Sequence, residues 1–162
     1  MSRGFVLIRA IVYASCFIAF LLIFVPARLL GRSGFARPAS IGITELAGAG
    51  VAVIGAIVAL WCVFTFVFVG QGTPAPFDPP RRLVVRGPYR FVRNPMYIGA
   101  GLALAGAAVV FRSLALIGYL ALLAAIVQAM VVWYEEPTLS RLFGADYEEY
   151  RRQVHRWVPR WP

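Results

Sequence analysis

Long stretches without a charged residue are the feature that most limits what this chain can fold into. Residues 10–27 give 18 uncharged positions in a row, and residues 46–69 give 24. As a helix, the longer stretch extends about 36 Å, enough to cross a hydrocarbon core about 30 Å thick. Because 60% of the chain is hydrophobic and only 14% is charged, we expect lipid rather than water around these helices. A cleaved signal peptide is the alternative for the first stretch, but the stretch exceeds a usual signal core and no convincing cleavage site follows.

Two further apolar stretches, separated by Arg112, predict a tight helical hairpin. The first covers 17 residues from Pro95 to Phe111, and the second runs from Ser113 to Tyr134. The four stretches together predict an all-α integral membrane protein with about four transmembrane helices in a single domain. The expected parts are two scaffold helices in residues 1–69, a Pro/Arg-rich cytosolic loop in residues 70–94, the hairpin in residues 95–134, and an interfacial C-terminal helix and tail in residues 135–162.

Small residues mark the faces on which these helices are expected to pack. They recur every four residues in two places, and such faces let helices approach closely in a membrane. The expected faces comprise Gly48, Ala52 and Ala56 in one helix and Gly99, Ala103 and Ala107 in another. They also permit a dimer, but the sequence does not decide the oligomeric state.

The C-terminal part changes character after Tyr134 and predicts an amphipathic helix. Its apolar residues fall on one face at helical spacing, and charged residues occupy the rest. Such a helix lies at the membrane interface or caps the helix bundle. The apolar face comprises Leu139, Leu142, Phe143, Tyr147, Tyr150 and Val154. The tail that follows contains Trp157 and Trp161, rings typical of membrane interfaces.

The net charge is +9, and all 16 basic residues are arginines. They flank the apolar stretches, so topology and lipid headgroups explain them better than nucleic acid, for which no motif is present. The arginine-rich segments before and after the hairpin fall on one side, which the positive-inside rule makes cytosolic, at the cytoplasmic membrane if the source is bacterial. With four spans, Arg28, Arg32 and Arg37 would lie on the opposite, outer side of the membrane, which contradicts this orientation. With one histidine, His155, and two cysteines inside apolar stretches, Cys16 and Cys62, no metal site is expected.

A hairpin brings its two ends together, so two polar clusters separated by about forty residues are predicted to meet. One lies between Tyr89 and Tyr97, and the other is the pair Glu135 and Glu136. Asn94 before Pro95 is a good helix start, and a helix N-terminus beside Arg90 and Arg93 is a natural receptor for a carboxylate or phosphate. The spacing alone favours the simpler alternative, in which Asn94 only caps and the arginines only set topology.

Glu135 and Glu136 are expected at a helix C-terminus, where paired acids oppose the helix dipole and require a positive partner. That partner is Arg90, Arg93 or a cationic ligand. Pro137 is expected to bend the chain directly afterwards and to hold the two acids at the mouth of the bundle.

The stretches GPYRFVRNPMYIG and EEPTLSRLFGADYEEYRRQVHRWVPR resemble the C-terminal signature of the isoprenylcysteine carboxyl methyltransferase and phospholipid methyltransferase family. That signature is GPYRxxRHPxYxG followed, about forty residues on, by EExxLxxxFGxxYxxY. The resemblance covers roughly residues 83–160 and implies a membrane enzyme that binds S-adenosylmethionine in its C-terminal half. The implied cofactor site comprises Tyr89, Arg90, Arg93, Asn94, Tyr97, Gly99, Glu135, Glu136, Leu139, Tyr147 and Tyr150.

One position departs from the family pattern, because Asn94 stands where the family often has histidine. An amide can donate or accept a hydrogen bond but cannot shuttle a proton at neutral pH. We therefore expect this position to hold the cofactor or cap the helix rather than to act as a base.

The implied acceptor is a lipid-like or prenylated small molecule among the membrane lipids. Carboxyl O-methylation is favoured and phospholipid N-methylation is next; Arg93 or Arg151 would orient a carboxylate, and Glu136 would take a proton from an amine. Two other classes stay open from the sequence. One is a nicotinamide-dependent membrane reductase of related architecture, and the other is a non-enzymatic accessory protein.

Overall fold

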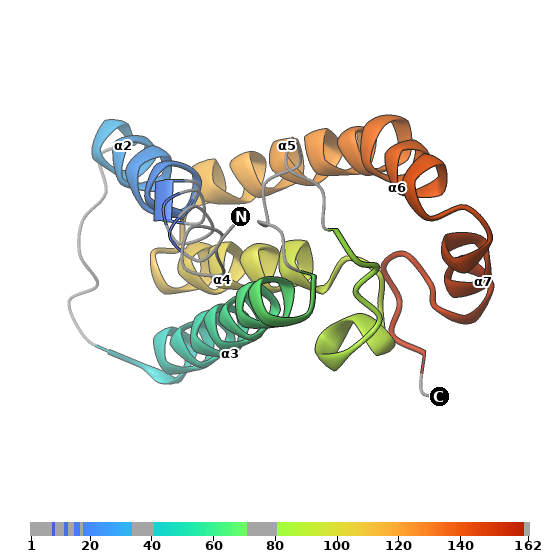
Figure 1. The fold of residues 1–162 in the computed structure, drawn as a ribbon. Helices are drawn as coiled ribbons and strands as arrows, with labels where there is room; N and C mark the ends of the chain where they lie inside the picture. Colours follow the sequence, from blue (N-terminus) through green and yellow to red (C-terminus); the bar gives the residue numbers. More distant parts are fainter. Residues whose placement is uncertain are drawn as a thin grey trace.

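The computed structural model describes residues 8, 12, 15–16, 18–33, 41–70 and 81–160, and its regular structure within these ranges is helical, without a strand. Figure 1 shows α3 (Ile43–Thr65), α4 (Pro95–Val110) and α5 (Leu114–Met130) stacked side by side, with α7 (Ala145–Gln153) at one end. The π-helix η2 (Phe66–Gly70) continues α3 directly. The expectations for Arg37 and for residues 71–80 lie outside the described residues.

Two helices are long and apolar enough to cross a membrane, Ile43–Gly70 and Leu114–Phe143. Few of their residues are buried, which is the reverse of a helix in a soluble core. The exposed side chains are large and apolar and include Leu46, Val53, Ile57, Leu60 and Phe64 on α3 and Leu114, Ile117, Leu122, Ile126 and Trp133 on the other helix. Such an apolar surface is stable in contact with lipid but unfavourable in contact with water, so the chain is a membrane protein.

The predicted count of four spans is not confirmed, because α4 has only 16 residues and the N-terminal stretch is described only in part. A π-helix, η1 (Ile18–Phe24), continues there into α2 (Val25–Arg32). The helix α2 thus includes Gly31 and ends at Arg32, and Ser33 follows it. Glycine in a helix costs only about 1 kcal/mol, and an arginine in the last turn favours the helix dipole.

Helix α4 packs far more extensively on α3 than on its hairpin partner α5. The contact is between backbones: a Cβ added at Gly106 would lie 2.4 Å from the Ala52 nitrogen, and one at Gly99 would lie 2.7 Å from the Ala59 nitrogen. Small-residue packing is thus confirmed, but two of the expected residues differ: Ala56 is exposed, and Ala107 packs against the cluster of Leu104, Ala108 and Leu116. The α3 face follows residues 48, 52, 55 and 59, because a strict four-residue step turns about 40° away from a 3.6-residue helix at each step.

The far end of the hairpin is tied to the start of α3. Arg112, at the turn between α4 and α5, has a φ of 44° and places its Nη2 2.6 Å from Glu45 Oε1. Glu45 is buried and also accepts a hydrogen bond from the Gly42 N–H at 2.9 Å. Ser113 caps α5 by accepting the Leu116 N–H at 3.3 Å. These contacts place the turn between α4 and α5 beside the N-terminal end of α3.

The second hairpin helix does not end at Tyr134, as expected, but continues to Phe143. A π-helical turn, η4 (Val131–Glu135), joins α5 to α6 (Glu136–Phe143), with the Glu136 N–H bonded to the Val131 carbonyl. Proline in a helix interior removes a hydrogen bond and crowds an earlier carbonyl, and the wider turn just before Pro137 relieves that conflict. The two glutamates therefore lie inside a continuous helix, not at a C-terminus.

The predicted C-terminal amphipathic helix is also not confirmed as one element. It is divided into α6 and α7 at Gly144, whose φ of 51° suits glycine. Tyr147, Tyr150 and Val154 form a buried cluster against Leu83, Leu139 and Phe143, whereas Leu142 is exposed. The apolar face of this region therefore packs on the protein itself.

Candidate functional site

The segment that leads into α4 is anchored before it reaches the site. Gly87 opens the 3-10 turn η3 (Gly87–Arg90) with a φ of 60°, and a Cβ there would lie 2.9 Å from the Thr65 hydroxyl. Tyr89 is buried in a cluster with Cys62 and Val84, and this burial raises the pKa of its phenol well above the usual range. The Tyr150 hydroxyl donates to the Tyr89 carbonyl at 2.6 Å. The start of α4 is thus joined to α3 on one side and α7 on the other.

Pro95 begins α4 as expected, but Asn94 does not cap it. Its amide instead donates to the backbone carbonyl of Arg156, at 3.2 Å. The expected cap is wrong because the Asn94 side chain turns toward the C-terminal tail, so its oxygen does not accept from the N–H groups of the first turn. Helix-start patterns do not take such a tail into account.

The hairpin brings its two ends together, as predicted. Tyr97, in the first turn of α4, donates a hydrogen bond from its hydroxyl to Glu135 Oε1. Both side chains are half-buried. The pair closes one side of the hairpin mouth and gives Glu135 a partner that carries no charge.

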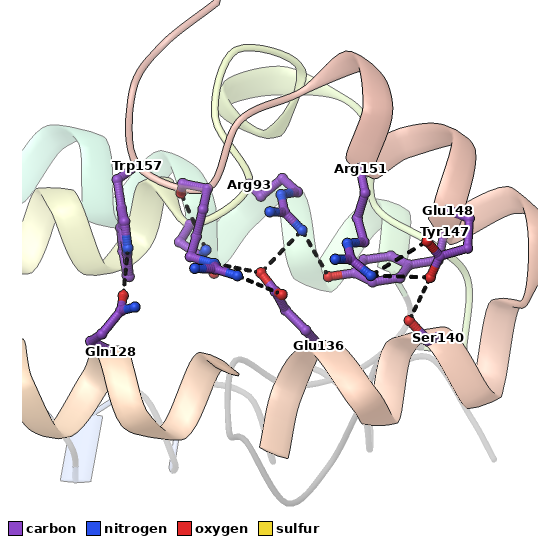
Figure 2. A network of polar contacts seen from close by, with 10 residues as sticks. Arg93, Gln128, Glu136, Ser140, Tyr147, Glu148, Arg151 and Trp157 are labelled. Carbon is purple, nitrogen blue, oxygen red and sulfur yellow. Dashed lines mark hydrogen bonds and ion pairs between the residues drawn. The ribbon is translucent and has the colours of Figure 1, made fainter. Parts of the chain in front are cut away.

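Glu136, the next residue, is the most buried acid in this cluster, with 9% of its side chain exposed. Arg156 binds it in bidentate fashion, with Nε 2.7 Å from Oε1 and Nη2 2.9 Å from Oε2. Arg93 adds a third contact, from Nη1 to Oε1 at 3.1 Å. Figure 2 shows Arg93 lying between Glu136 and Tyr147.

Arg93 is itself 90% buried, since only 10% of its side chain is exposed. Its Nη1 also donates to the Tyr147 hydroxyl at 3.3 Å. Its Nε is the only buried side-chain nitrogen or oxygen without a hydrogen-bond partner in the described part of the chain. An unpaired N–H of a buried cation is costly, and an anionic ligand would satisfy it.

The C-terminal tail completes the cluster, and sequence reasoning missed it. The backbone N–H of Arg93 donates to the His155 carbonyl at 2.9 Å, and the backbone N–H of Arg160 donates to the Phe91 carbonyl at 2.8 Å. Trp157, expected only as an interface ring, donates from its indole to Gln128 Oε1 at 2.7 Å (Figure 2). No motif or spacing marks Arg156 as the partner of Glu136, so the sequence carried no usable signal for it.

Several predicted site residues lie away from the Glu136 cluster. Arg90 is exposed, with its guanidinium 4.4 Å from the centre of the Phe91 ring. Gly99 lies in the α3–α4 contact, and Leu139 packs on the cluster of Tyr147 and Tyr150. Arg151 pairs with Glu148 at 3.2 Å and keeps 39% of its side chain exposed. These positions support the walls of the site or border it.

Burial sets the protonation of the tyrosines on α7. It raises the pKa of both Tyr147 and Tyr150, so each is a neutral phenol at physiological pH. The hydrogen bonds to Glu136 raise the pKa of the Arg156 guanidinium. The Tyr147 hydroxyl can therefore accept from Arg93 and still has a proton to donate.

Comparisons with known proteins identify relatives of the region that contains this cluster. A family model described as phospholipid methyltransferase matches residues 43–146. Two curated proteins, from Oryza sativa subsp. indica and subsp. japonica, are each named probable protein-S-isoprenylcysteine O-methyltransferase and are 30% identical over 91 residues. The match covers 51% of this chain but only 44% of each relative. No solved structure gives a significant match.

Proposed function

Because the chain belongs to the phospholipid methyltransferase family, we propose that it transfers the methyl group of S-adenosylmethionine to a lipid-like or prenylated acceptor at the membrane surface. The observation that carries this proposal is the buried cluster of Arg93, Glu136 and Arg156 at one end of two membrane-crossing helices. Charged groups at the end of apolar helices suit a reaction between a polar cofactor and a lipid-borne acceptor.

The residues fit the amino-acid end of this cofactor, which carries a carboxylate and an ammonium group. The unpartnered Arg93 Nε supports a site for the carboxylate, and the oxygens of Glu135 and Glu136 suit the ammonium or ribose hydroxyls. S-adenosylmethionine supplies an electrophilic methyl group on a positively charged sulfur, so the chain needs no covalent nucleophile. Its residues bind, align the reactants and exclude water.

We favour a carboxylate as the acceptor. Both oxygens of Glu136 already accept hydrogen bonds from guanidinium groups, which leaves Glu136 poorly placed to take a proton from an amine. A carboxylate acceptor has no proton to lose, and the names of the two rice proteins agree with this choice. Arg151, on the exposed side of the cluster, could orient such an acceptor. N-methylation of a phospholipid, with Glu136 as the base, is the second candidate because it agrees with the family name.

We also propose that the site faces the cytosol. In the described residues, ten arginines lie in residues 81–93 and 141–160, which Figure 1 shows near the same end of the helices. Arg112 lies at the opposite end. Arg28 and Arg32 belong to that end too, because Leu29 and Leu30 pack against the cluster of Leu116 and Phe111. The end that carries the site still has the larger number of arginines, so the positive-inside rule places that end in the cytosol.

The test is transfer of an isotope-labelled methyl group by the full chain in lipid vesicles that contain either a prenyl-cysteine or phosphatidylethanolamine. We expect label in the prenyl-cysteine ester, which base hydrolysis releases, and loss of transfer in Arg93→Gln. The matched control is Arg152→Gln, whose exposed side chain pairs with Glu149. Purified protein that binds NADPH but neither S-adenosylmethionine nor S-adenosylhomocysteine would contradict the proposal and support a reductase.

A further inference from the structure

The C-terminal tail crosses the start of α4 and is held there by the backbone of both segments. Two hydrogen bonds join residues 91 and 93 to residues 160 and 155, and the Asn94 amide adds a third contact, to the Arg156 carbonyl. The Trp157 indole ties the same tail to α5 through Gln128. Arg156 therefore reaches Glu136 from a segment whose path is fixed on both sides.

Two guanidinium groups share one carboxylate in this arrangement, and they share it unequally. Arg156 takes the bidentate position with Nε and Nη2, whereas Arg93 reaches Glu136 through Nη1 alone. Bidentate pairing is the preferred geometry of arginine with a carboxylate. Because Arg156 occupies it, Arg93 keeps a buried Nε–H without a partner. The cluster of Arg93, Glu136 and Arg156 also carries one positive charge in excess.

We propose that Arg156 is a positioning residue that keeps the Arg93 Nε–H available to the carboxylate at the amino-acid end of the methyl donor. It does so by holding Glu136 in the bidentate ion pair, and Asn94 holds the tail in the place where this pair can form. Without Arg156, Arg93 would itself bind Glu136 in bidentate fashion, through Nε and an Nη. Its Nε–H would then no longer be available to a ligand. This inference rests on the proposed function, because it concerns the same ligand.

Holding the tail is a role for Asn94 that needs no proton transfer. Its amide is a donor at every pH, and the acceptor is a backbone carbonyl. Asn94 acts on the site only through Arg156, so the effects of changing the two residues should not add.

The test compares two ligands of the full chain in detergent, S-adenosylhomocysteine and 5′-methylthioadenosine. Both contain the adenosine and a thioether, but only the first has the carboxylate and the ammonium group. For Arg156→Gln we expect affinity for S-adenosylhomocysteine to fall about tenfold, the order of one charge-assisted hydrogen bond, with methylthioadenosine unchanged. Asn94→Ala should give a smaller loss of the same kind, and the double variant no more than Arg156→Gln alone. The matched control, Arg152→Gln, should bind both ligands like the unmodified chain.

Equal losses for both ligands in Arg156→Gln, or no loss for either, would overturn the inference and leave the proposed function standing. Failure of the unmodified chain to bind S-adenosylhomocysteine would overturn both. If Arg156→Gln does not fold, Asn94→Ala carries the test, because it removes no charge. Unchanged affinities in that variant would then reject the positioning role.

Discussion

Replacing Glu136 with Gln removes the negative charge at the centre of the candidate site while keeping its size. In the structure, Glu136 accepts from Arg156 at 2.7 and 2.9 Å and pairs with Arg93 at 3.1 Å. Removing one member of a buried ion pair costs about 3–5 kcal/mol, because the other charge is left uncompensated. Arg156 keeps 29% of its side chain exposed, so water recovers part of this cost. We expect the free energy of unfolding to fall by about 2–3 kcal/mol.

The same change should weaken the site for its ligand. With Glu136 neutral, Arg93 and Arg156 repel each other, and neither is held in place for a carboxylate; we expect affinity for S-adenosylhomocysteine to fall at least about tenfold. Isothermal titration in detergent measures the affinity, and thermal unfolding measures the stability. The matched control is Glu149→Gln, an exposed acid paired with Arg152. If Glu136→Gln binds and unfolds like this control, the ion pair with Arg93 and Arg156 contributes to neither stability nor binding.

Three further changes test separate parts of the structure. Tyr97→Phe leaves Glu135 without its hydroxyl donor and should cost about 1–3 kcal/mol of stability, seen as a lower unfolding temperature; an unchanged temperature would show that the hydrogen bond does not form. Gly106→Ala should force α3 and α4 apart and sharply reduce the yield of folded protein, whereas Gly118→Ala, with nothing within 4 Å of the added Cβ, should not; equal yields would reject the close contact. Arg112→Gln should lower the unfolding temperature, because it leaves Glu45 without its ion-pair partner, and should leave ligand affinity unchanged, since Arg112 lies at the opposite end from the site; a weaker affinity would contradict that placement.

The meeting of the two polar clusters could be predicted because it follows from chain geometry. Two antiparallel helices joined by a short turn must bring their outer ends together, whatever their side chains. Tyr97 with Glu135 and Arg93 with Glu136 are the contacts that result. The Asn94–Pro95 helix start was predicted in its backbone but not in the direction of the amide.

The rest depends on contacts that periodicity does not encode. The π turn before Pro137 leaves no mark in the composition of residues 131–135, so the helix was expected to end there. Arg156 lies 20 residues from Glu136 in an irregular tail, where no spacing rule applies. The packing face of α3 was misplaced at Ala56 because repeated small residues suggest a constant step of four, whereas helices require alternating steps of four and three.

The proposed cofactor site is formed by the start of α4, the π turn and the tail together. The most direct measurement is an experimental structure of the full chain in lipid with S-adenosylhomocysteine bound. The ligand's carboxylate should lie against Arg93 Nε, with its amino group beside Glu136 and the tail still in place over α4. A nucleoside bound elsewhere, with the Arg93–Glu136–Arg156 cluster unchanged and out of contact with it, would contradict the account.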